Sequence, residues 1–185
     1  MNPGEDRDEF LMARVARGEA ELLERLLRRH ASPLLTFIRR MVGDRHRSEE
    51  LFQEVFLAVW DRRRQYQYPR PFKPWLYAIA LNKCRAAFRS RPPPQQSLDG
   101  VGLAAPGPPP PEALIAGETA ALVSRAVTLL PPQQRAVVVL RIWEGLPYDR
   151  IAEIVGRTES TVRAHMHHGL AALRKDLERY LEVQG

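Results

Sequence analysis

Basic and aromatic side chains dominate one stretch of the chain, residues 62–91. This stretch holds nine basic residues and no acidic one. Its aromatic residues are Tyr66, Tyr68, Phe72, Trp75, Tyr77 and Phe88. Basic groups attract phosphate and aromatic rings stack on unpaired bases, so the combination indicates a nucleic-acid-binding surface. The alternative is a solvated basic face that covers aromatic residues of the core.

A second feature suited to nucleic acid lies between residues 147 and 175. The segment PYDRIAEIVG predicts a short helix that ends at Gly156, and Thr158 is a suitable N-cap for the helix that follows. Two short helices joined by a Gly-Arg-Thr turn have the spacing of a helix-turn-helix motif. The apolar stripe of the second helix comprises Val162, Met166, Leu170, Leu173 and Leu177. The opposite side presents Ser160, Ala164, His167, His168 and Lys175, with Arg163 and His165 on its flanks. This division favours docking in the DNA major groove, although a purely structural amphipathic helix would have it too.

The sequence offers no arrangement typical of an enzyme. It has no phosphate-cradling glycine loop, no nucleophile beside a plausible base and no metal-ligand spacing. His165 and His168 are one helical turn apart, but no carboxylate or cysteine completes a metal site with them. The single cysteine, Cys84, excludes an internal disulfide and lies in an apolar helical pattern, so we expect it to be buried. We therefore expect a binding protein with no catalytic residue, metal, cofactor or small-molecule substrate.

Two groups of predicted helices position these residues, so the expected fold class is all-α. No window alternates with a period of two over enough residues to predict a strand. Pro33 is expected to kink or divide the first helix, because proline lacks the backbone donor that a helix interior needs. Apolar residues at spacings of three and four predict helices over residues 22–41, 51–60, 75–88, 113–130 and 147–156. A further helix is expected to open at Pro131-Pro132, and the last helix is expected to begin near residue 158.

A proline-rich stretch separates the two groups. Residues 92–111 hold eight of the sixteen prolines and have no apolar period, which predicts a linker. We expect a small N-terminal helical bundle over residues 1–91, a proline-rich linker over 92–112 and a C-terminal helix-turn-helix domain over 113–185. The apolar runs are too short to span a bilayer, and the acidic, polar first ten residues contain no secretory signal. A soluble cytoplasmic protein without membrane insertion is expected.

Four stretches together resemble the extracytoplasmic-function sigma factors, which are compact bacterial transcription initiation factors. They are EELFQEVFLAVW (49–60), PWLYAIALNKCR (74–85), LLPPQQRAVVVLRIWEGLPYDRIAEIVGRTESTVRAHMHHGLAALR (129–174) and the proline-rich stretch, in the family's order and spacing. The resemblance implies an alternative sigma factor that binds core RNA polymerase and recognises and opens promoter DNA. It also implies an anti-sigma factor that masks both domains. The polymerase, and not this chain, would then be the enzyme.

The resemblance further assigns roles to individual residues. The segment 61–91 would open the minus-ten promoter element and hold a flipped base, with Asn82 in the base pocket. The other residues implied there are Tyr66 and Phe72 near the base and Lys73, Lys83, Arg85 and Arg89 on phosphates, whereas Trp75 is expected in the core. The residues implied in docking on the polymerase coiled coil are Glu50, Leu51, Gln53 and Glu54.

The last helix would bind the minus-thirty-five element as duplex DNA. The residues implied in this contact are Arg157, Ser160, Thr161, Arg163, Ala164, His167 and His168. His165 and His168 stand where arginine is common in the family, which implies a weaker and more pH-sensitive attraction to phosphate. Together with Arg150, which stands where the family often has an acidic residue, they imply an altered promoter sequence.

Two other functions remain open from the sequence. A stand-alone helix-turn-helix repressor or activator would use only the C-terminal domain and would leave the basic, aromatic stretch without a role. A nuclease that used this stretch as its substrate groove is opposed by the lack of any carboxylate within residues 62–91 to hold a metal ion.

Overall fold

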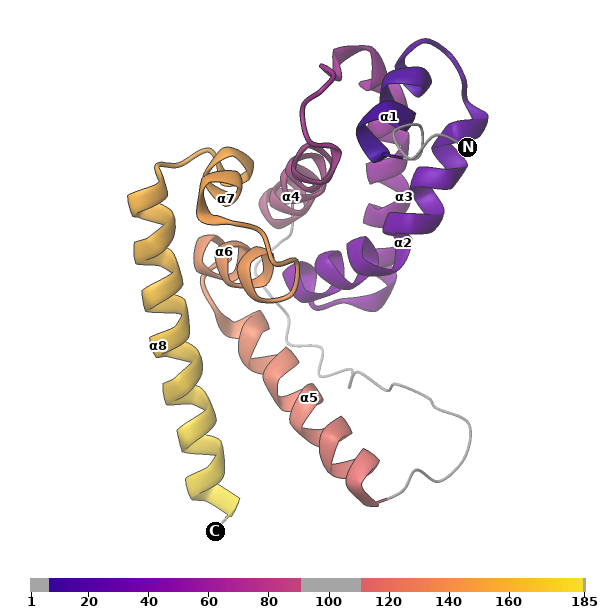
Figure 1. The fold of residues 1–185 in the computed structure, drawn as a ribbon. Helices are drawn as coiled ribbons and strands as arrows, with labels where there is room; N and C mark the ends of the chain where they lie inside the picture. Colours follow the sequence, from indigo (N-terminus) through magenta and orange to yellow (C-terminus); the bar gives the residue numbers. More distant parts are fainter. Residues whose placement is uncertain (1–6, 91–110, 185) are drawn as a thin grey trace.

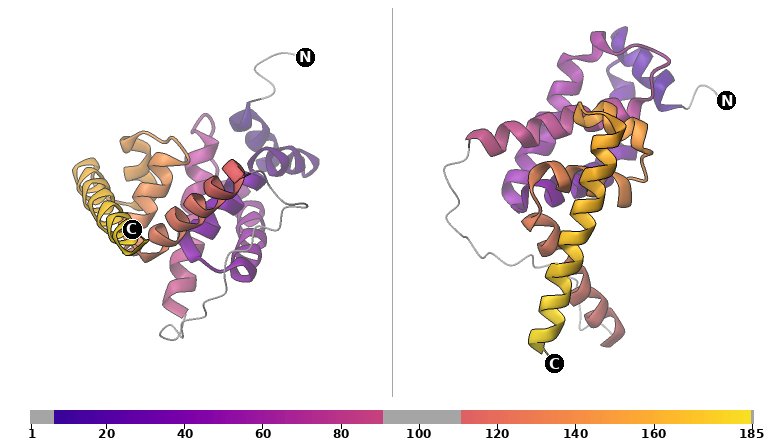
Figure 2. Two further views of the ribbon diagram at one scale, coloured as in Figure 1. Left: turned by 90° about the horizontal axis from the view of Figure 1, so that it is seen from below. Right: turned by 90° about the vertical axis from the view of Figure 1, so that its left-hand side faces the viewer.

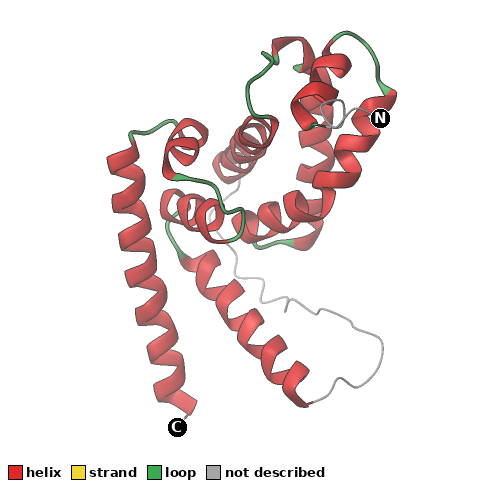
Figure 3. Cartoon of the chain, viewed as in Figure 1, coloured by secondary structure: helices red, strands yellow, loops and turns green. Residues whose placement is uncertain are grey.

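The computed structural model describes residues 7–90 and 111–184 (Figure 1). Within these two ranges every regular element is helical (Figure 3), which confirms the expected fold class. None of the helices in the described ranges is long and apolar enough to cross a membrane. The first range contains α1 (Asp8–Ala16), α2 (Glu21–Val42), α3 (Arg45–Asp61), the 3-10 turn η1 (Arg63–Gln65) and α4 (Phe72–Ser90). The second contains α5 (Pro111–Leu129), α6 (Pro132–Ile142), α7 (Tyr148–Val155) and α8 (Glu159–Gln184). The linker expected over residues 92–112 falls almost wholly outside the described residues.

Local chemistry accounts for most helix boundaries. Gly43 ends α2 with a φ of +78°, and the Asp44 side chain accepts a hydrogen bond of 2.7 Å from the Arg47 backbone N–H at the start of α3. Gly156 ends α7 with a φ of +69°, and Thr158 Oγ1 accepts a 3.3 Å hydrogen bond from the Thr161 N–H, as expected from the sequence. These caps satisfy backbone groups that the helix ends would otherwise leave unpaired.

Pro33 does not divide its helix, although division was one of the two outcomes expected from the sequence. α2 continues through Pro33 from Glu21 to Val42. Pro33 lies on the exposed side of the helix, while Leu26 and Leu34 on either side of it are fully buried in the same core. The burial of a continuous apolar stripe therefore outweighs the ~3 kcal/mol that an internal proline costs.

The N-terminal bundle packs α2, α3 and α4 around an apolar core that α1 closes. Phe37 of α2 and Tyr77 of α4 meet edge to face, with ring centroids 5.0 Å apart. Leu11 and Met12 of α1 are both 0% exposed, so this helix belongs to the core although the sequence pattern did not predict it. Its nine residues are too few for a clear apolar period.

The C-terminal helices pack around α6, whose residues Val137–Leu140 are all buried. α8 crosses α6 so closely that a Cβ built on Gly169 would lie 2.7 Å from Val138 Cγ2. The two helical groups also pack against each other: α7 lies along α4, and α6 and α5 contact α2 (Figures 1 and 2). The fold therefore brings the predicted nucleic-acid stretch of α4 against the first helix of the helix-turn-helix.

Candidate nucleic-acid interface

One face of α3 remains open to solvent on the N-terminal bundle. It is formed by Glu50, Gln53, Glu54 and Leu57, which we call the docking face. Glu50 is followed by Gln53 and Glu54 three and four residues later, and Leu57 follows these by four and three, so all four lie on one side of the helix. Leu57 is 65% exposed at the C-terminal end of this otherwise polar surface. Leu57 was not predicted as a contact residue, although its position outside the apolar stripe of the helix was a sign of its exposure.

Leu51 does not belong to the docking face. It is 1% exposed and packs in the core. The expectation that it contacts a partner is therefore not met in this arrangement, because the stripe of Leu51, Val55 and Val59 is what holds α3 against the bundle.

Ion pairs hold the carboxylates of the docking face in place. Arg47 bonds to Glu50 at 2.8 Å and lies 3.5 Å from Glu54, whose other oxygen is 3.1 Å from the Lys83 ammonium. The hydrogen bond to Glu50 raises the pKa of Arg47. Lys83 is thereby attached to the docking face, although the resemblance assigned it to a DNA phosphate. The face is acidic at its exposed edge and apolar at Leu57.

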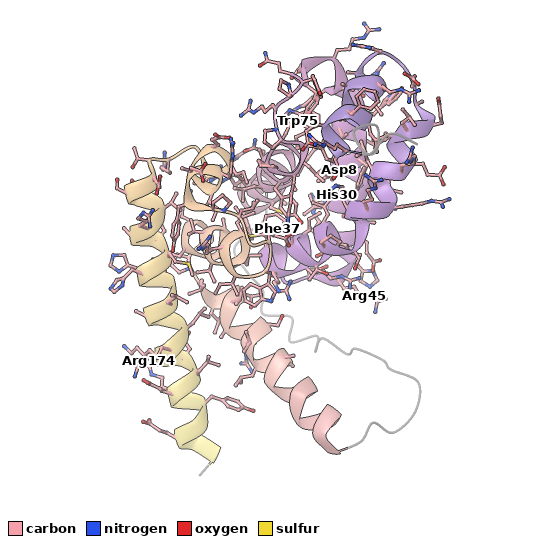
Figure 4. The ribbon with its side chains drawn as sticks, in the orientation of Figure 1. Asp8, His30, Phe37, Arg45, Trp75 and Arg174 are labelled. Carbon is pink, nitrogen blue, oxygen red and sulfur yellow. The ribbon has the colours of Figure 1, made fainter. Side chains whose placement is uncertain are left out.

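A short loop, residues 66–71, joins η1 to α4 and is built on buried aromatic rings. Tyr66 is 7% exposed and Phe72 is 0% exposed. Their rings meet edge to face with centroids 6.3 Å apart, and Tyr66 meets Trp75 at 5.3 Å. The Tyr66 hydroxyl donates to the Arg70 backbone oxygen, and burial raises the pKa of this phenol, so the donor proton stays in place. The expected core position of Trp75 agrees with its partial burial in this cluster (Figure 4).

This burial corrects the expected roles of Tyr66 and Phe72. A ring that is already enclosed by other rings has no free face on which a base could stack. The aromatic residue that the loop does present is Tyr68, which is 60% exposed. Tyr68 was not predicted to contact a base, because nothing in the local spacing distinguishes a loop tyrosine that points inward from one that points outward.

The remaining expected residues of α4 fall into two sets. Asn82 and Arg89 are exposed on the helix surface. Lys73 and Arg85 contact the C-terminal helices: Lys73 donates to the Glu144 backbone oxygen at 2.8 Å, and Arg85 donates to the Val155 oxygen at 3.1 Å. Partial burial lowers the pKa of Arg85. The fold therefore leaves Asn82 and Arg89 exposed and engages the half-buried Lys73 and Arg85 in contacts with the C-terminal domain.

The lone cysteine is buried as expected. Cys84 is 0% exposed, and this burial raises the pKa of its thiol to about 12. At neutral pH the thiol is protonated and unreactive.

The helix-turn-helix presents its polar face as the sequence predicts. Val162 is 0% exposed and Met166 is 8% exposed, so the inner side of α8 packs on the domain. Leu170 departs from the predicted stripe and is 44% exposed. The residues expected to contact duplex DNA lie on the opposite, outward side, which we call the recognition face: Arg157, Ser160, Arg163, Ala164, His167 and His168 are exposed, and Thr161 is half-buried.

Arg163 is held in position on the recognition face. Its guanidinium pairs with Glu159 one turn earlier and lies 4.3 Å from the centre of the Tyr148 ring at the start of α7. The His167 and His168 rings lie side by side with centroids 5.6 Å apart. Among the described residues, no group of three or more histidine, cysteine or acidic side chains could hold a metal ion.

Comparison with known proteins agrees with this arrangement. Residues 26–92 match the family model for sigma-70 region 2, and residues 120–173 match that for sigma-70 region 4. The chain is 30% identical over 182 residues to the ECF RNA polymerase sigma factor SigL of Mycobacterium tuberculosis, covering 90% of this chain and 97% of that one. It is 32% identical over 173 residues to the RNA polymerase sigma factor CarQ of Myxococcus xanthus, covering 93% and 99%. The chain belongs to the extracytoplasmic-function sigma factors of the sigma-70 family. It is an alternative sigma factor that directs transcription initiation.

Solved structures share the fold of this sigma factor. CnrH in complex with the cytosolic domain of CnrY superposes with a TM-score of 0.72 at 23% identity, covering 94% of this chain and 99% of that one. The sigma factor RpoE of Bartonella quintana, in complex with the anti-sigma factor NepR, superposes with a TM-score of 0.66 at 21% identity, covering 84% and 96%. Both likenesses extend over the N-terminal and C-terminal helices together.

Proposed function

We propose that this sigma factor binds core RNA polymerase through the docking face of α3 and contacts promoter DNA at two separate places. The N-terminal bundle, residues 1–91, would act at the minus-ten element, and the C-terminal domain, residues 113–185, at the minus-thirty-five element, with residues 92–112 as the linker. The observation that carries the proposal is the exposed docking face, since a protein that only bound duplex DNA through α8 would have no use for it. An acidic face with one apolar side chain fits a partner helix with basic and apolar groups.

At the minus-ten element we propose that Tyr68 and Asn82 contact the opened strand. Tyr68 offers a free ring for stacking, and the Asn82 amide both donates and accepts hydrogen bonds at a base edge. Arg89 is exposed on the same helix and supplies charge for the phosphates. The rigid ring cluster under the loop would reduce the entropy lost when the loop binds.

At the minus-thirty-five element we propose that the recognition face of α8 enters the major groove. Its first turn carries Ser160, Arg163 and Ala164, and His167 and His168 follow one turn later.

We further propose that an anti-sigma factor regulates the protein, as the names of related structures indicate for their own complexes. RNA synthesis would be carried out by the polymerase and not by this chain. Because the polymerase acts in the bacterial cytoplasm, we propose that the sigma factor acts there too.

The test is co-elution of the purified protein with sigma-free bacterial core polymerase on a sizing column. Stoichiometric association is expected, and Leu57→Arg should abolish it because a buried contact would receive an unpaired charge. The matched control is Leu170→Arg, which changes another exposed leucine, 44% exposed on α8, outside the docking face. Absence of association by the wild-type protein, together with tight binding to duplex DNA alone, would favour a stand-alone repressor or activator instead.

A further inference from the structure

The connection between α6 and α7 places one buried carboxylate against the N-terminal bundle. The Glu144 side chain is only 4% exposed. The Tyr77 hydroxyl donates a hydrogen bond of 2.5 Å to Glu144 Oε2, and the Lys73 ammonium lies 3.3 Å from the same oxygen. Burial and this carboxylate both raise the pKa of Tyr77, which keeps its hydroxyl a donor. Both partners of the carboxylate therefore come from α4, across the contact between the two helical groups.

The neighbouring residues strengthen the same contact. Arg40 of α2 lies 4.4 Å from the centre of the Trp143 ring, beside Glu144. Lys73 also donates to the Glu144 backbone oxygen at 2.8 Å, so a single lysine holds both the side chain and the main chain of Glu144. Three positive or donor groups of the N-terminal bundle thus surround this short connection. A buried carboxylate is stable only with such compensation, because its removal from water is costly.

A second anchor lies at the other end of the contact. Arg85 of α4 donates to the Val155 backbone oxygen at 3.1 Å and to Gln133 Oε1 at 3.3 Å. Lys73 and Arg85 are two of the cations expected to bind promoter phosphates, and in this structure both serve the C-terminal domain. The docking face is unaffected, since Glu50, Gln53 and Leu57 remain exposed.

We propose that Glu144 is an internal lock that competes with DNA phosphate for Lys73 and so holds the sigma factor in a closed, DNA-excluding form. The Lys73 ammonium faces two oxygens of Glu144, the backbone oxygen and Oε2, so a phosphate that approached it would compete with this carboxylate. Closure and DNA binding at α4 therefore oppose each other, and each must weaken the other by the same factor. Because the docking face stays exposed, the closed form keeps its proposed access to polymerase while Lys73 and Arg85 are engaged by the C-terminal domain. The role given to Lys73 rests on the proposed function, whereas the closed form itself does not.

The test compares two substitutions of the same kind at the same contact. Glu144→Gln keeps the size of the side chain and an oxygen that accepts from Tyr77, but removes the charge that attracts Lys73. The matched control is Glu153→Gln. Glu153 pairs with Arg150 of its own helix at 2.9 Å and lies 3.9 Å from Arg70 across the same contact, and the side chains of Glu153 and Arg70 are 41% and 54% exposed. Exposed pairs of this kind contribute little, so their loss should have no measurable effect.

Each full-length variant is labelled with donor and acceptor dyes at cysteines introduced at Glu24 and Lys175, one on each helical group. Energy transfer reports closure, and fluorescence anisotropy reports binding of a 20-nucleotide single-stranded oligothymidylate. We expect Glu144→Gln to lower the transfer efficiency and to bind the oligonucleotide about tenfold more tightly than wild type, and Glu153→Gln to remain within about twofold. Oligonucleotide added to the wild-type protein should also lower the transfer efficiency, because the coupling is reciprocal.

Unchanged transfer efficiency and oligonucleotide affinity in a folded Glu144→Gln variant would overturn the lock. If that variant fails to fold by circular dichroism, the wild-type titration decides: no change in energy transfer at saturating oligonucleotide would also overturn it. Co-elution with core polymerase is measured on the same samples. Loss of co-elution by the wild-type protein would refute the proposed function and leave the result on closure standing.

Discussion

Replacement of Arg135 by methionine should produce a large loss of stability. Arg135 is 7% exposed and donates to three backbone oxygens: those of Met41 at the end of α2, Thr128 near the end of α5, and Leu130 at 3.0 Å. These carbonyls lie where helices end and so have no further helical partners. One side chain therefore compensates two helix ends that belong to different helical groups.

The magnitude follows from these three bonds. A hydrogen bond to a charged group contributes ~1.5–3 kcal/mol, so three at the lower value sum to about 4.5 kcal/mol. The substitution also removes the desolvation penalty of a buried guanidinium, which is evident in the lowered pKa of Arg135, and methionine fills part of the space. We expect the free energy of unfolding of Arg135→Met to be lower than that of wild type by about 2–4 kcal/mol.

Urea unfolding followed by far-ultraviolet circular dichroism measures this difference. Arg174→Met is the matched control, because Arg174 is 82% exposed on α8 (Figure 4) and its solvent-screened pair with Glu178 should contribute little to stability. If Arg135→Met and Arg174→Met unfolded at the same urea concentration with the same slope, the inference that Arg135 holds the three carbonyls would be refuted.

Three further changes test other parts of the structure. Gly169→Ala should lower the unfolding free energy by about 1–3 kcal/mol, because its Cβ would meet the fully buried Val138; thermal unfolding checks this, and a more stable variant would show that α8 can move away from α6. Asp8→Asn should be destabilising at neutral pH, and its difference from wild type should shrink on acidification below about pH 4. The reason is that a hydrogen bond from His30, 2.6 Å away (Figure 4), holds the pKa of Asp8 below its ordinary 3.8. The stability that the Asp8 carboxylate contributes is therefore present above pH 3.8 and is lost as the pH falls through the lowered pKa. Urea unfolding at several pH values checks this trend, and a difference that stayed constant with pH would contradict it. Tyr68→Ala should reduce promoter opening, detected as permanganate-reactive thymines, by about fivefold or more if one stacking contact of ~1–3 kcal/mol is lost, while Tyr68→Phe retains opening. Normal opening by Tyr68→Ala, with core binding intact, would remove this residue from the base contact.

Much of the helical fold and of the recognition face could be predicted from sequence. The turn from Gly156 to Thr158, the short helix before it and the polar side of α8 all depend on residues close together in the chain. Prediction fell short in two places, for different reasons. Pro33 lies inside one undivided helix because buried leucines on both sides of it face one core, which is long-range information. α1 was missed because three buried apolar residues in nine residues form no clear period.

The candidate site was predictable in composition but not in orientation. The stretch of residues 62–91 was identified by its basic and aromatic content, yet Tyr66 and Phe72 turned out to be enclosed and Tyr68 exposed. All three are aromatic residues of one segment, so their types carry no information about which ring faces water. Similarly, Leu51 was predicted to contact a partner but is buried in the core, and Leu57, which was not predicted, is exposed on the docking face.

The sequence by itself determined the family, the all-helical class, the helix-turn-helix and its capping residues, because these depend on local periodicity and on motifs in a fixed order. The tertiary structure alone decided the partners of Lys73, Arg85 and Arg135. In the hydrogen bonds that join the two helical groups, each of these residues lies between 48 and 94 residues from its partner along the chain. Sequence spacing does not specify such pairs, because they form only when two separately folded surfaces meet and bury each other's charges. That meeting is what turns Lys73 from a free cation on α4 into the partner of a buried carboxylate.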